Sequence, residues 1–394
     1  MTEAKPAVGS TPIYLDHHAT TPVDPRVLEA MLPYFTERFG NAASRTHRRG
    51  WDAKEAVERA REQVARALGA AKGEIVFTSG ATEANNLALA GLLDAYGERR
   101  RGLVVSAIEH PSVLDTARWL AEARGAKLTI LPVEADGVVR MEAVREAVDE
   151  HTLLCSVMAA NNEVGTLQPI AEIGAHCRSV GAFFHTDAVQ AIGKVPFDVL
   201  EQHVDCASLS GHKVHGPQGI GAIFLKRRDP RVRPAPLLHG GGHERGFRSG
   251  TLPLPLIVGL GEALALAAAE RERESRVLLT LRDRLHRLIT DALEGVVVHG
   301  TMEEGARLPG NLNLSFEGVE AEPLLLGLRE LCLSSGSACA SATPTPSHVL
   351  RAMGVSDDLA HGSLRFGIGR YNTEVEIDRA AELVIARVRK LRGS

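Results

Sequence analysis

The sequence predicts an α/β protein in which a large, mostly parallel sheet is followed by a smaller α+β domain. From about residue 50 to residue 225, short apolar runs alternate with amphipathic helical patterns, as in parallel strands joined by covering helices. After a glycine-rich loop at 239–245, long helical patterns come first and short strands follow. A length of 394 residues also favours two domains over a single core.

The elements of the first part follow one another in a regular order. Amphipathic patterns predict helices, because their apolar residues recur at intervals of three and four. Short continuous apolar runs predict strands that are buried on both faces of the sheet. The expected helices cover residues 52–68, 82–95, 111–124, 141–149 and 170–180, and the expected strands cover 74–78, 103–107, 128–133, 153–159, 182–185, 205–209 and 221–225.

The second part has a different pattern. Helices are expected at 255–274, 276–293 and 373–391, and strands at 296–299, 311–316 and 363–368. Apolar residues at helical spacing form the buried stripe of the last helix: Ile377, Ala381, Val384, Val388 and Leu391. We therefore expect an N-terminal arm at 1–15 that packs with the small domain, a large domain at 16–262 and a small domain at 263–394.

Composition excludes several classes of function. The apolar share of 44% and the net charge of −4 are typical of a soluble globular protein and do not indicate binding to nucleic acid or membranes. No apolar segment is long enough to span a bilayer, and the N-terminal residues lack the apolar core of a signal peptide. Five cysteines, sparse and odd in number, favour free thiols in a reducing compartment, so we expect a cytoplasmic protein.

The most informative stretch surrounds Lys213. The sequence there is Ser-Gly-His-Lys at 210–213, directly after an apolar run and ahead of a Gly-Pro turn at 216–217. A lysine held on such a tight loop is partly desolvated, which lowers its pKa and makes its amine available for a Schiff base. Asp187 follows the apolar run at 182–185. A Schiff-base lysine and an aspartate that pairs with a pyridinium nitrogen are what pyridoxal 5′-phosphate requires.

Three motifs follow other expected strands, and each also has a purely structural interpretation. Around Ala81 and Thr82, backbone donors at a helix N-terminus would bind a phosphate, or Thr82 would simply cap the helix. His110 is held before Pro111, where it would lie flat on a ring and move protons, or be an ordinary loop histidine. Asn162 would be a turn former, or a ligand for a ring hydroxyl or a carboxylate.

The remaining polar candidates also have two interpretations. Asp187 would cap a helix or pair with a ring nitrogen, and Gln190 lies on the same helical face, within reach of the ring oxygen. Arg365, inside a short strand, would bind a carboxylate substrate or form a structural ion pair. The cluster at 16–18, Asp-His-His, has no matching set of metal ligands, so we expect a turn there and no metal site.

Cys339 lies in a stretch of small and polar residues at 334–346. The other four cysteines sit in apolar strand or helix contexts, where they are expected to pack in the core: Cys155, Cys177, Cys206 and Cys332. A thiol on an exposed loop is a liability unless its reactivity is used. We therefore interpret Cys339 as a nucleophile.

Together these residues resemble one family over nearly the whole chain. Its most specific motifs are Ser-Gly-His-Lys at 210–213, Arg-Ser-Gly-Thr at 248–251 and Ser-Gly-Ser-Ala-Cys at 335–339. They are similar to the NifS/IscS-like cysteine desulfurases of group I, within the class V aminotransferase family of fold-type I pyridoxal phosphate enzymes. The resemblance implies that the cofactor belongs to the large domain, and that the small domain carries the Cys339 loop and Arg365.

The resemblance also implies a role for each candidate residue. Lys213 would carry the cofactor as a Schiff base and later act as the base at the substrate Cα, while Cys339 would take the sulfur. Arg365 and Asn162 would bind the carboxylate of L-cysteine. Thr251 would reach the phosphate of the neighbouring subunit, which makes the enzyme a homodimer with shared sites. The other implied contacts to the cofactor come from Asp187 (ring nitrogen), Gln190 (ring oxygen), His110 (stacking on the ring), and Ala81, Thr82, Ser210 and His212 (phosphate).

The activity implied by the resemblance is removal of sulfur from L-cysteine. The products would be L-alanine and a Cys339 persulfide, whose sulfur goes to an acceptor protein such as an iron–sulfur scaffold, or to thiolation of tRNA or another product. An alternative is selenocysteine lyase or another class V lyase, which would keep Lys213 without needing Cys339. A further alternative is a pseudoenzyme that only docks sulfur-handling or regulatory partners.

Overall fold

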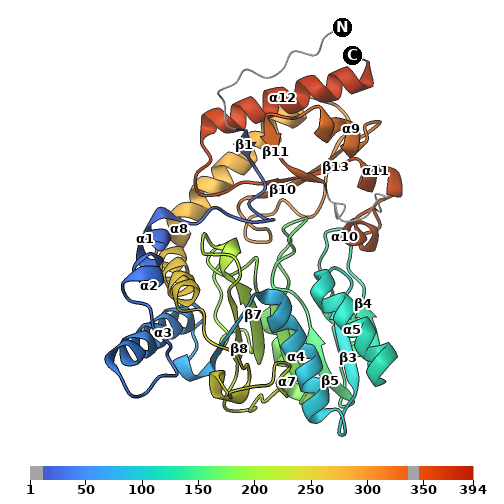
Figure 1. The fold of residues 1–394 in the computed structure, drawn as a ribbon. Helices are drawn as coiled ribbons and strands as arrows, with labels where there is room; N and C mark the ends of the chain where they lie inside the picture. The colour runs from blue at the N-terminus through green and yellow to red at the C-terminus, as the bar shows by residue number, and fades with distance from the viewer. Residues whose placement is uncertain (1–11, 336–345, 394) are drawn as a thin grey trace.

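The computed structural model describes residues 12–335 and 346–393, which build two large sheets with separate hydrophobic cores and a third sheet of only two strands. The larger sheet and its helices lie in the lower part of Figure 1, and the smaller sheet lies above them. The predicted fold class, a large parallel-dominant sheet followed by a smaller α+β part, is therefore confirmed. No helix in the described ranges is both long and apolar enough to cross a membrane.

The larger sheet has seven strands, and their pairing explains why the sequence shows short apolar runs. Five of the strands, β3 to β7, pair with one another in parallel. The strand β8 is antiparallel to both of its neighbours, β7 and the edge strand β2. Most of these strands are buried on both faces, so they carry apolar residues without alternation. The spatial order is β2 (Ile75–Thr78), β8 (Gly221–Leu225), β7 (Cys206–Ser210), β6 (Phe183–Asp187), β5 (Thr152–Ser156), β3 (Gly102–Ser106) and β4 (Lys127–Leu131).

Helices cover both faces of this sheet, and successive strand residues point to opposite faces. In β2, Phe77 packs into one core and Val76 into the other. The first core also holds side chains of α1 (Pro25–Met31), α2 (Pro33–Thr36), α3 (Arg48–Ala67), α6 (Met141–Ala147) and α7 (Ile170–Val180). The second core holds side chains of α4 (Ala81–Tyr96) and α5 (Pro111–Arg124).

The smaller sheet has four antiparallel strands, in the order β12 (Ser334–Ser335), β13 (Ser363–Gly367), β10 (Asn311–Phe316) and β9 (Val296–Val298). Its core is shared with α9 (Ala321–Leu326) and α12 (Glu374–Arg392), and α10 (His348–Ala352) and α11 (Asp357–His361) lie beside it. Near the N-terminus, β1 (Ile13–Tyr14) pairs in parallel with β11 (Leu331–Cys332). Three 3₁₀ turns complete the elements: Lys72–Glu74, Gly211–Lys213 and Glu244–Gly246.

One helix differs from the prediction. The two helices expected at 255–274 and 276–293 form a single helix, α8 (Leu254–Ala292), which runs from the larger sheet to the smaller one (Figure 1). No glycine or proline occurs between residues 262 and 292, so nothing interrupts the backbone hydrogen bonds. The prediction was wrong because the apolar pattern breaks at the charged stretch 270–276. There the helix passes between the two cores, with Leu264 in one and Leu278 in the other.

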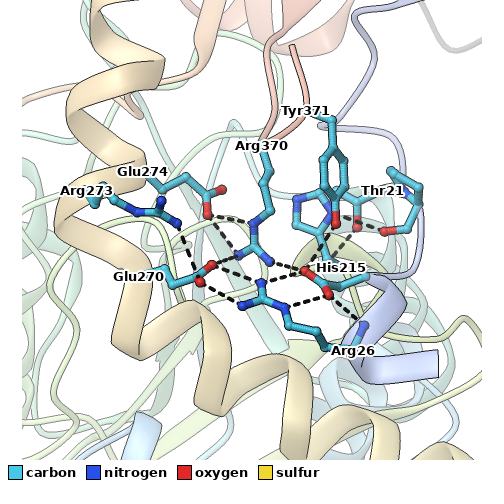
Figure 2. Close-up of polar contacts among 10 residues, drawn as sticks. Thr21, Arg26, His215, Glu270, Arg273, Glu274, Arg370 and Tyr371 are labelled. Carbon is cyan, nitrogen blue, oxygen red and sulfur yellow. Dashed lines mark hydrogen bonds and ion pairs between the residues drawn. The ribbon is translucent and has the colours of Figure 1, made fainter. Parts of the chain in front are cut away.

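An ionic network joins the two parts of the molecule (Figure 2). Asp24, which caps α1, accepts hydrogen bonds from Arg26 and from Arg370, a residue that follows β13. Arg370 also pairs with Glu274 of α8 at 2.8 Å, and Arg26 pairs with Glu270 of the same helix at 2.8 Å. Three segments that are distant in sequence are therefore held together beside the space between the two sheets.

Candidate active site

A cavity of about 670 Å3 lies at the carboxyl ends of the parallel strands, as expected for an open α/β sheet. Polar side chains from both sheets line it, and Arg365 is the contribution of the smaller sheet. Of the twelve residues predicted for the site, ten line this cavity: Ala81, Thr82, His110, Asn162, Asp187, Gln190, Ser210, His212, Lys213 and Arg365. The structure brings these ten together from six segments of the chain that are separate in sequence.

The other two predicted site residues are Cys339 and Thr251. Cys339 lies outside the described residues. Thr251 is exposed and is not part of the cavity wall in its own chain.

Lys213 ends the 3₁₀ turn that directly follows β7, so the strand places it at the edge of the sheet. Its Nζ donates hydrogen bonds to the backbone oxygens of His18 and Ala19, both at 2.6 Å. Burial lowers the pKa of Lys213 to about 8, and the nearby positive charge of Arg365 acts in the same direction. A lysine in this environment has a much larger share of neutral, nucleophilic amine near pH 7 than a surface lysine has.

Asp187 is the last residue of β6, next to β7 in the middle of the sheet. Its Oδ2 accepts a hydrogen bond from Nδ2 of Asn85 at 2.8 Å, and its Oδ1 accepts one from the backbone N–H of Val189 at 3.0 Å. No helix begins here, so the alternative of a helix cap is wrong, and Asp187 instead closes a short turn. The carboxylate is almost fully buried and accepts hydrogen bonds on both oxygens, which fixes its position.

His110 caps α5, and Pro111 takes the first position of the helix, as predicted. The backbone N–H of Ser112 donates to Nδ1 of His110 at 3.1 Å, and the Ser112 hydroxyl lies 2.8 Å from the same atom. Because Nδ1 is an acceptor, the proton of the neutral ring is on Nε2. Burial lowers the pKa of His110, so the ring is neutral near pH 7.

The N-terminus of α4 opens onto the cavity. Gly80 is the cap residue, and no side chain caps the helix, so the alternative in which Thr82 is the cap is wrong. The first backbone N–H groups of α4, which include those of Ala81 and Thr82, have no partner within the helix and suit an anion. Glu83, in the same turn, is neutralised by Arg248 at 2.9 Å.

Arg365 and Asn162 lie together on the side of the cavity nearest to the smaller sheet. Nη2 of Arg365 pairs with Asp16 at 2.7 Å, and Nη1 donates to the backbone oxygen of Asn162 at 3.3 Å. Its buried Nε has no partner among the described residues. The structural ion pair that the sequence left open is therefore present, and the guanidinium lines the cavity as well.

Asn85 is the residue that sequence reasoning missed most clearly. One amide nitrogen of this fully buried side chain donates both to Asp187 and to the Ser112 hydroxyl, so it links the positions of Asp187 and His110. An asparagine on the apolar face of a predicted helix is a signal that points to such a role. His18 and Thr20 were also missed as cavity residues, because the segment at 16–18 was interpreted only as a turn. Within the described ranges, no three or more histidine, cysteine, aspartate or glutamate side chains form a group suited to a metal ion.

Residues 13–380 match the family described as aminotransferase class-V. The chain belongs to the class V aminotransferase family. A cysteine desulfurase IscS from Rickettsia felis is 51% identical over 381 residues, which are 97% of this chain and 92% of that protein. A solved structure described as a NifS-like protein has a TM-score of 0.88 at 37% identity, with 95% of this chain and 99% of that chain covered. A structure of SspA in complex with cysteine has a TM-score of 0.80 at 38% identity, with 92% and 100% covered.

Class V aminotransferases of this kind depend on pyridoxal 5′-phosphate, and the cavity fits that cofactor. A phosphate matches the uncapped N-terminus of α4, and a Cβ added at Gly80 would meet nothing within 4 Å, so this end of the cavity is open to an anion. The buried carboxylate of Asp187 matches a protonated ring nitrogen, and the amine of Lys213 matches the aldehyde. The donors and acceptors needed by the cofactor are therefore present around one cavity.

Proposed function

We propose that this class V aminotransferase is a cysteine desulfurase that takes the sulfur of L-cysteine onto Cys339. The Cβ–S bond of the substrate breaks, a Cβ–H bond forms, and the sulfur atom is bonded to the Sγ of Cys339. The products are L-alanine and a Cys339 persulfide. Atoms and electrons balance without an external oxidant or reductant, because one neutral sulfur atom moves: Cβ–SH of the substrate becomes Cβ–H, and Sγ–H of Cys339 becomes Sγ–SH.

The observation that carries this proposal is the shared cavity of Lys213 and Arg365. It combines an amine of lowered pKa with a guanidinium suited to an α-carboxylate, which are the two groups needed to hold an amino acid at a pyridoxal cofactor. Identity of 51% to cysteine desulfurases supports cysteine as the amino acid. The bound cysteine in the related SspA structure supports the same choice.

In the proposed site, each end of the cofactor meets its own group of residues. Asp187 holds the ring nitrogen, Gln190 the ring oxygen, and the imidazole of His110 stacks on the ring. The phosphate is bound by Ala81, Thr82, Ser210 and His212. When bound, pyridoxal 5′-phosphate withdraws electrons from the bonds of the substrate α-carbon, which makes the Cα–H acidic and the Cβ–S bond breakable.

Lys213 has two tasks in this proposal. Its amine holds the cofactor until the substrate arrives, and it then moves a proton at the α-carbon. Only the neutral amine accepts a proton, so the pKa of about 8 suits this work near neutral pH. His110, with its proton on Nε2, is the neighbouring group able to donate a proton.

Arg365 and Asn162 orient the substrate through its carboxylate. Arg365 keeps Asp16 as a partner on Nη2 and the backbone oxygen of Asn162 on Nη1, and it offers its remaining N–H groups to the substrate. With the carboxylate fixed, the side-chain sulfur of cysteine has a defined direction. The thiolate of Cys339 then attacks that sulfur.

We propose that the enzyme is a homodimer in which Thr251 reaches the phosphate in the neighbouring cavity. Exposure of Thr251 away from its own cavity supports this arrangement. Large apolar side chains are exposed on α1 and α2 and just after them, as expected for a surface that a second subunit covers: Leu28, Leu32, Phe35 and Phe39.

We also propose the division of labour between domains that the sequence predicts. Residues 16–262 would bind the cofactor, and residues 263–394 would present Arg365 and Cys339, with the arm at 1–15 packed on the small domain. A cytoplasmic location is supported by the four described cysteines, all of which are free thiols. The acceptor of the sulfur would be a protein, such as an iron–sulfur scaffold or a component of a thiolation pathway.

Mass spectrometry after incubation with L-cysteine tests the function directly. We expect one added sulfur atom on the peptide that contains Cys339, together with L-alanine in equal amount for a single turnover. The variant Cys339→Ser is expected to keep the bound cofactor and to lose both products. Cys332→Ser is the matched control, because it removes another thiol of the same part of the chain and should leave the reaction unchanged.

Two results would contradict the proposal. Added sulfur on Cys332 in place of Cys339 would show that Cys339 is not the nucleophile. Full alanine production by Cys339→Ser would favour a lyase that needs no thiol of its own, such as a selenocysteine lyase.

A further inference from the structure

Lys194 is a lysine whose charged end points at the proposed cofactor site without belonging to it. It lies in the turn after β6, and its Nζ donates a hydrogen bond to Oε1 of Gln190 at 2.8 Å. Lys194 lines a small cavity behind the main one, whose wall includes His18 and Lys213. Gln190 lines the main cavity itself, and it is the cavity residue to which Lys194 donates a hydrogen bond.

An ordinary structural role would require a counter-ion, and Lys194 makes no ion pair with any carboxylate in the described ranges. Glu274 is the acid whose charge acts on it most. That carboxylate is already engaged by Arg370, with Nη2 at 2.8 Å and Nε at 2.9 Å, within the network of Figure 2. The ammonium of Lys194 therefore donates a hydrogen bond to the neutral amide of Gln190, which is an uncommon use of a lysine enclosed in a protein.

This contact determines which way the Gln190 amide points. An ammonium has donors and no acceptor, so the amide atom beside it must be the oxygen. Nδ1 of His18 lies 3.1 Å from the same Oε1, and Nε2 of Gln190 donates to the backbone oxygen of His18 at 3.0 Å. Oε1 is thus occupied from two sides, and one hydrogen of Nε2 stays available to the cavity.

We propose that Lys194 is a positioning residue: it orients the Gln190 amide so that its free N–H meets the cofactor's ring oxygen, and its positive charge stabilises that oxygen as an anion. The inference rests on the proposed placement of the ring oxygen at Gln190. It goes further by assigning the residue that enforces this contact.

The charge of Lys194 is sensitive to its surroundings. Burial lowers the pKa of Lys194 to about 7, the charge of Lys213 acts in the same direction, and Glu274 opposes them. Three histidines face the same small cavity, and burial lowers the pKa of each, so they are neutral near pH 7: His17, His18 and His215. The fixed charges around Lys194 are therefore those of Glu274, Arg370 and Arg365.

The visible absorbance of the bound cofactor reports on this arrangement. The nitrogen that joins Lys213 to the cofactor and the ring oxygen share one proton, and the absorbance changes when that proton leaves. A positive charge and a hydrogen-bond donor at the ring oxygen both favour loss of the proton. Removing them in Lys194→Met should raise the pKa of the absorbance change by about one unit.

The experiment is a pH titration of the visible spectrum of the holoenzyme, without cysteine, for the wild type and five variants. Lys194→Met should show the full upward shift, and Lys194→Gln, which keeps a donor but no charge, a smaller upward shift. In the Gln190→Leu background, the substitution Lys194→Met should move the pKa less than in the wild type, because the part of the effect that passes through the amide is gone and only the effect of the charge through space remains. Lys54→Met, which removes an exposed lysine of α3, should leave the pKa unchanged.

A merely structural role of Lys194 would lower the thermal stability and leave the spectral pKa in place, and that result would overturn the proposal. An equal shift in the presence and absence of Gln190 would overturn the route through the amide. If Lys194→Met does not fold, an unshifted spectral pKa in Lys194→Gln would overturn the proposal in its place. Since no variant is judged by turnover of cysteine, failure of the proposed desulfurase activity would be seen separately.

Discussion

The two sheets contribute unequally to the same cavity. The seven-stranded sheet and its loops supply Lys213, Asp187 and His110, whereas the four-stranded sheet supplies Arg365. A parallel sheet that helices cover on both faces has only its strand ends available for polar chemistry. The antiparallel sheet packs the apolar side chains of one face on its own core, and its other face carries polar side chains, among which Arg365 lines the cavity.

The difference suggests that the two sheets perform different parts of the reaction. The strand ends of the larger sheet carry the groups that fit the cofactor. The smaller sheet carries the group that fits the substrate carboxylate, and β12 and α10 flank residues 336–345, which include Cys339. Both parts must keep their relative position, and the network around Asp24 and Arg370 lies where they meet (Figure 2).

The largest effect is expected from Lys213→Ala in the larger sheet. We expect a fall in alanine production of about ten thousandfold, because the variant lacks both the attachment point and the base. The shift of the cofactor's visible absorbance on binding should disappear as well. Lys213→Arg, which keeps the charge but cannot form the Schiff base, should be as inactive. Substantial turnover by either variant would show that the chemistry does not reside in this sheet.

The next effect concerns the pH at which the apoprotein takes up its cofactor. Only the neutral amine attacks the aldehyde, so the rate of attachment should rise with pH around a midpoint near 8 instead of the ordinary 10.5 of lysine. The charge of Arg365 helps to lower this pKa, so Arg365→Leu should move the midpoint upward. Stopped-flow absorbance over a pH series measures both. A midpoint that does not respond to Arg365→Leu would mean that the two sheets are not electrostatically coupled.

The connection between the two parts is tested by Asp24→Asn. Asp24 is 2% exposed and holds Arg370 at 2.7 Å and Tyr371 at 3.1 Å. Loss of its charge should lower the free energy of unfolding by about 3 kcal/mol, because buried partners are left incompletely paired. Urea denaturation near neutral pH measures this change. Glu330→Gln, which breaks an exposed pair with Arg379, is the control and should cost far less.

The same carboxylate predicts a pH dependence of stability. Its hydrogen bonds with Arg26, and then those with Arg370 and Tyr371, hold the pKa of Asp24 below its ordinary value of 3.8, although burial opposes them. Its contribution to stability is therefore complete above that pH and decreases as the pH falls further. The stability difference between the wild type and Asp24→Asn should accordingly narrow in strong acid.

The smallest of these effects is expected from Arg365→Lys in the smaller sheet. A lysine cannot reproduce the planar donor set, so KM for L-cysteine should rise about thirtyfold while cofactor binding stays normal. Arg284→Lys is the matched control, because Arg284 forms a bidentate pair with Asp378 away from the cavity. A purely structural Arg365 would instead lower the melting temperature and leave KM unchanged. Such a result would remove substrate binding from the role of the smaller sheet.

Much of this architecture could be predicted from local pattern. The helices at 111–124 and 170–180 and the strands at 221–225 and 311–316 have the bounds that the sequence predicts. The two helices have residues with a strong preference for a helix end: Pro111 takes the first position of α5, and Gly181 follows the end of α7. The undivided α8 could not be predicted, since its change of core depends on where the two sheets lie.

For the site, the sequence alone predicted the candidate residues, because an amine and a carboxylate at strand ends and a guanidinium inside a short strand show their chemistry in the pattern around them. Only the tertiary structure decided how those residues are held. The bonds from Asn85 to Asp187, from Asp16 to Arg365 and from Lys194 to Gln190 join side chains whose direction depends on packing. The first and second of these connect residues 102 and 349 positions apart in the chain. Local sequence preferences extend over a few residues, so contacts across such separations are set by the fold that brings the segments together.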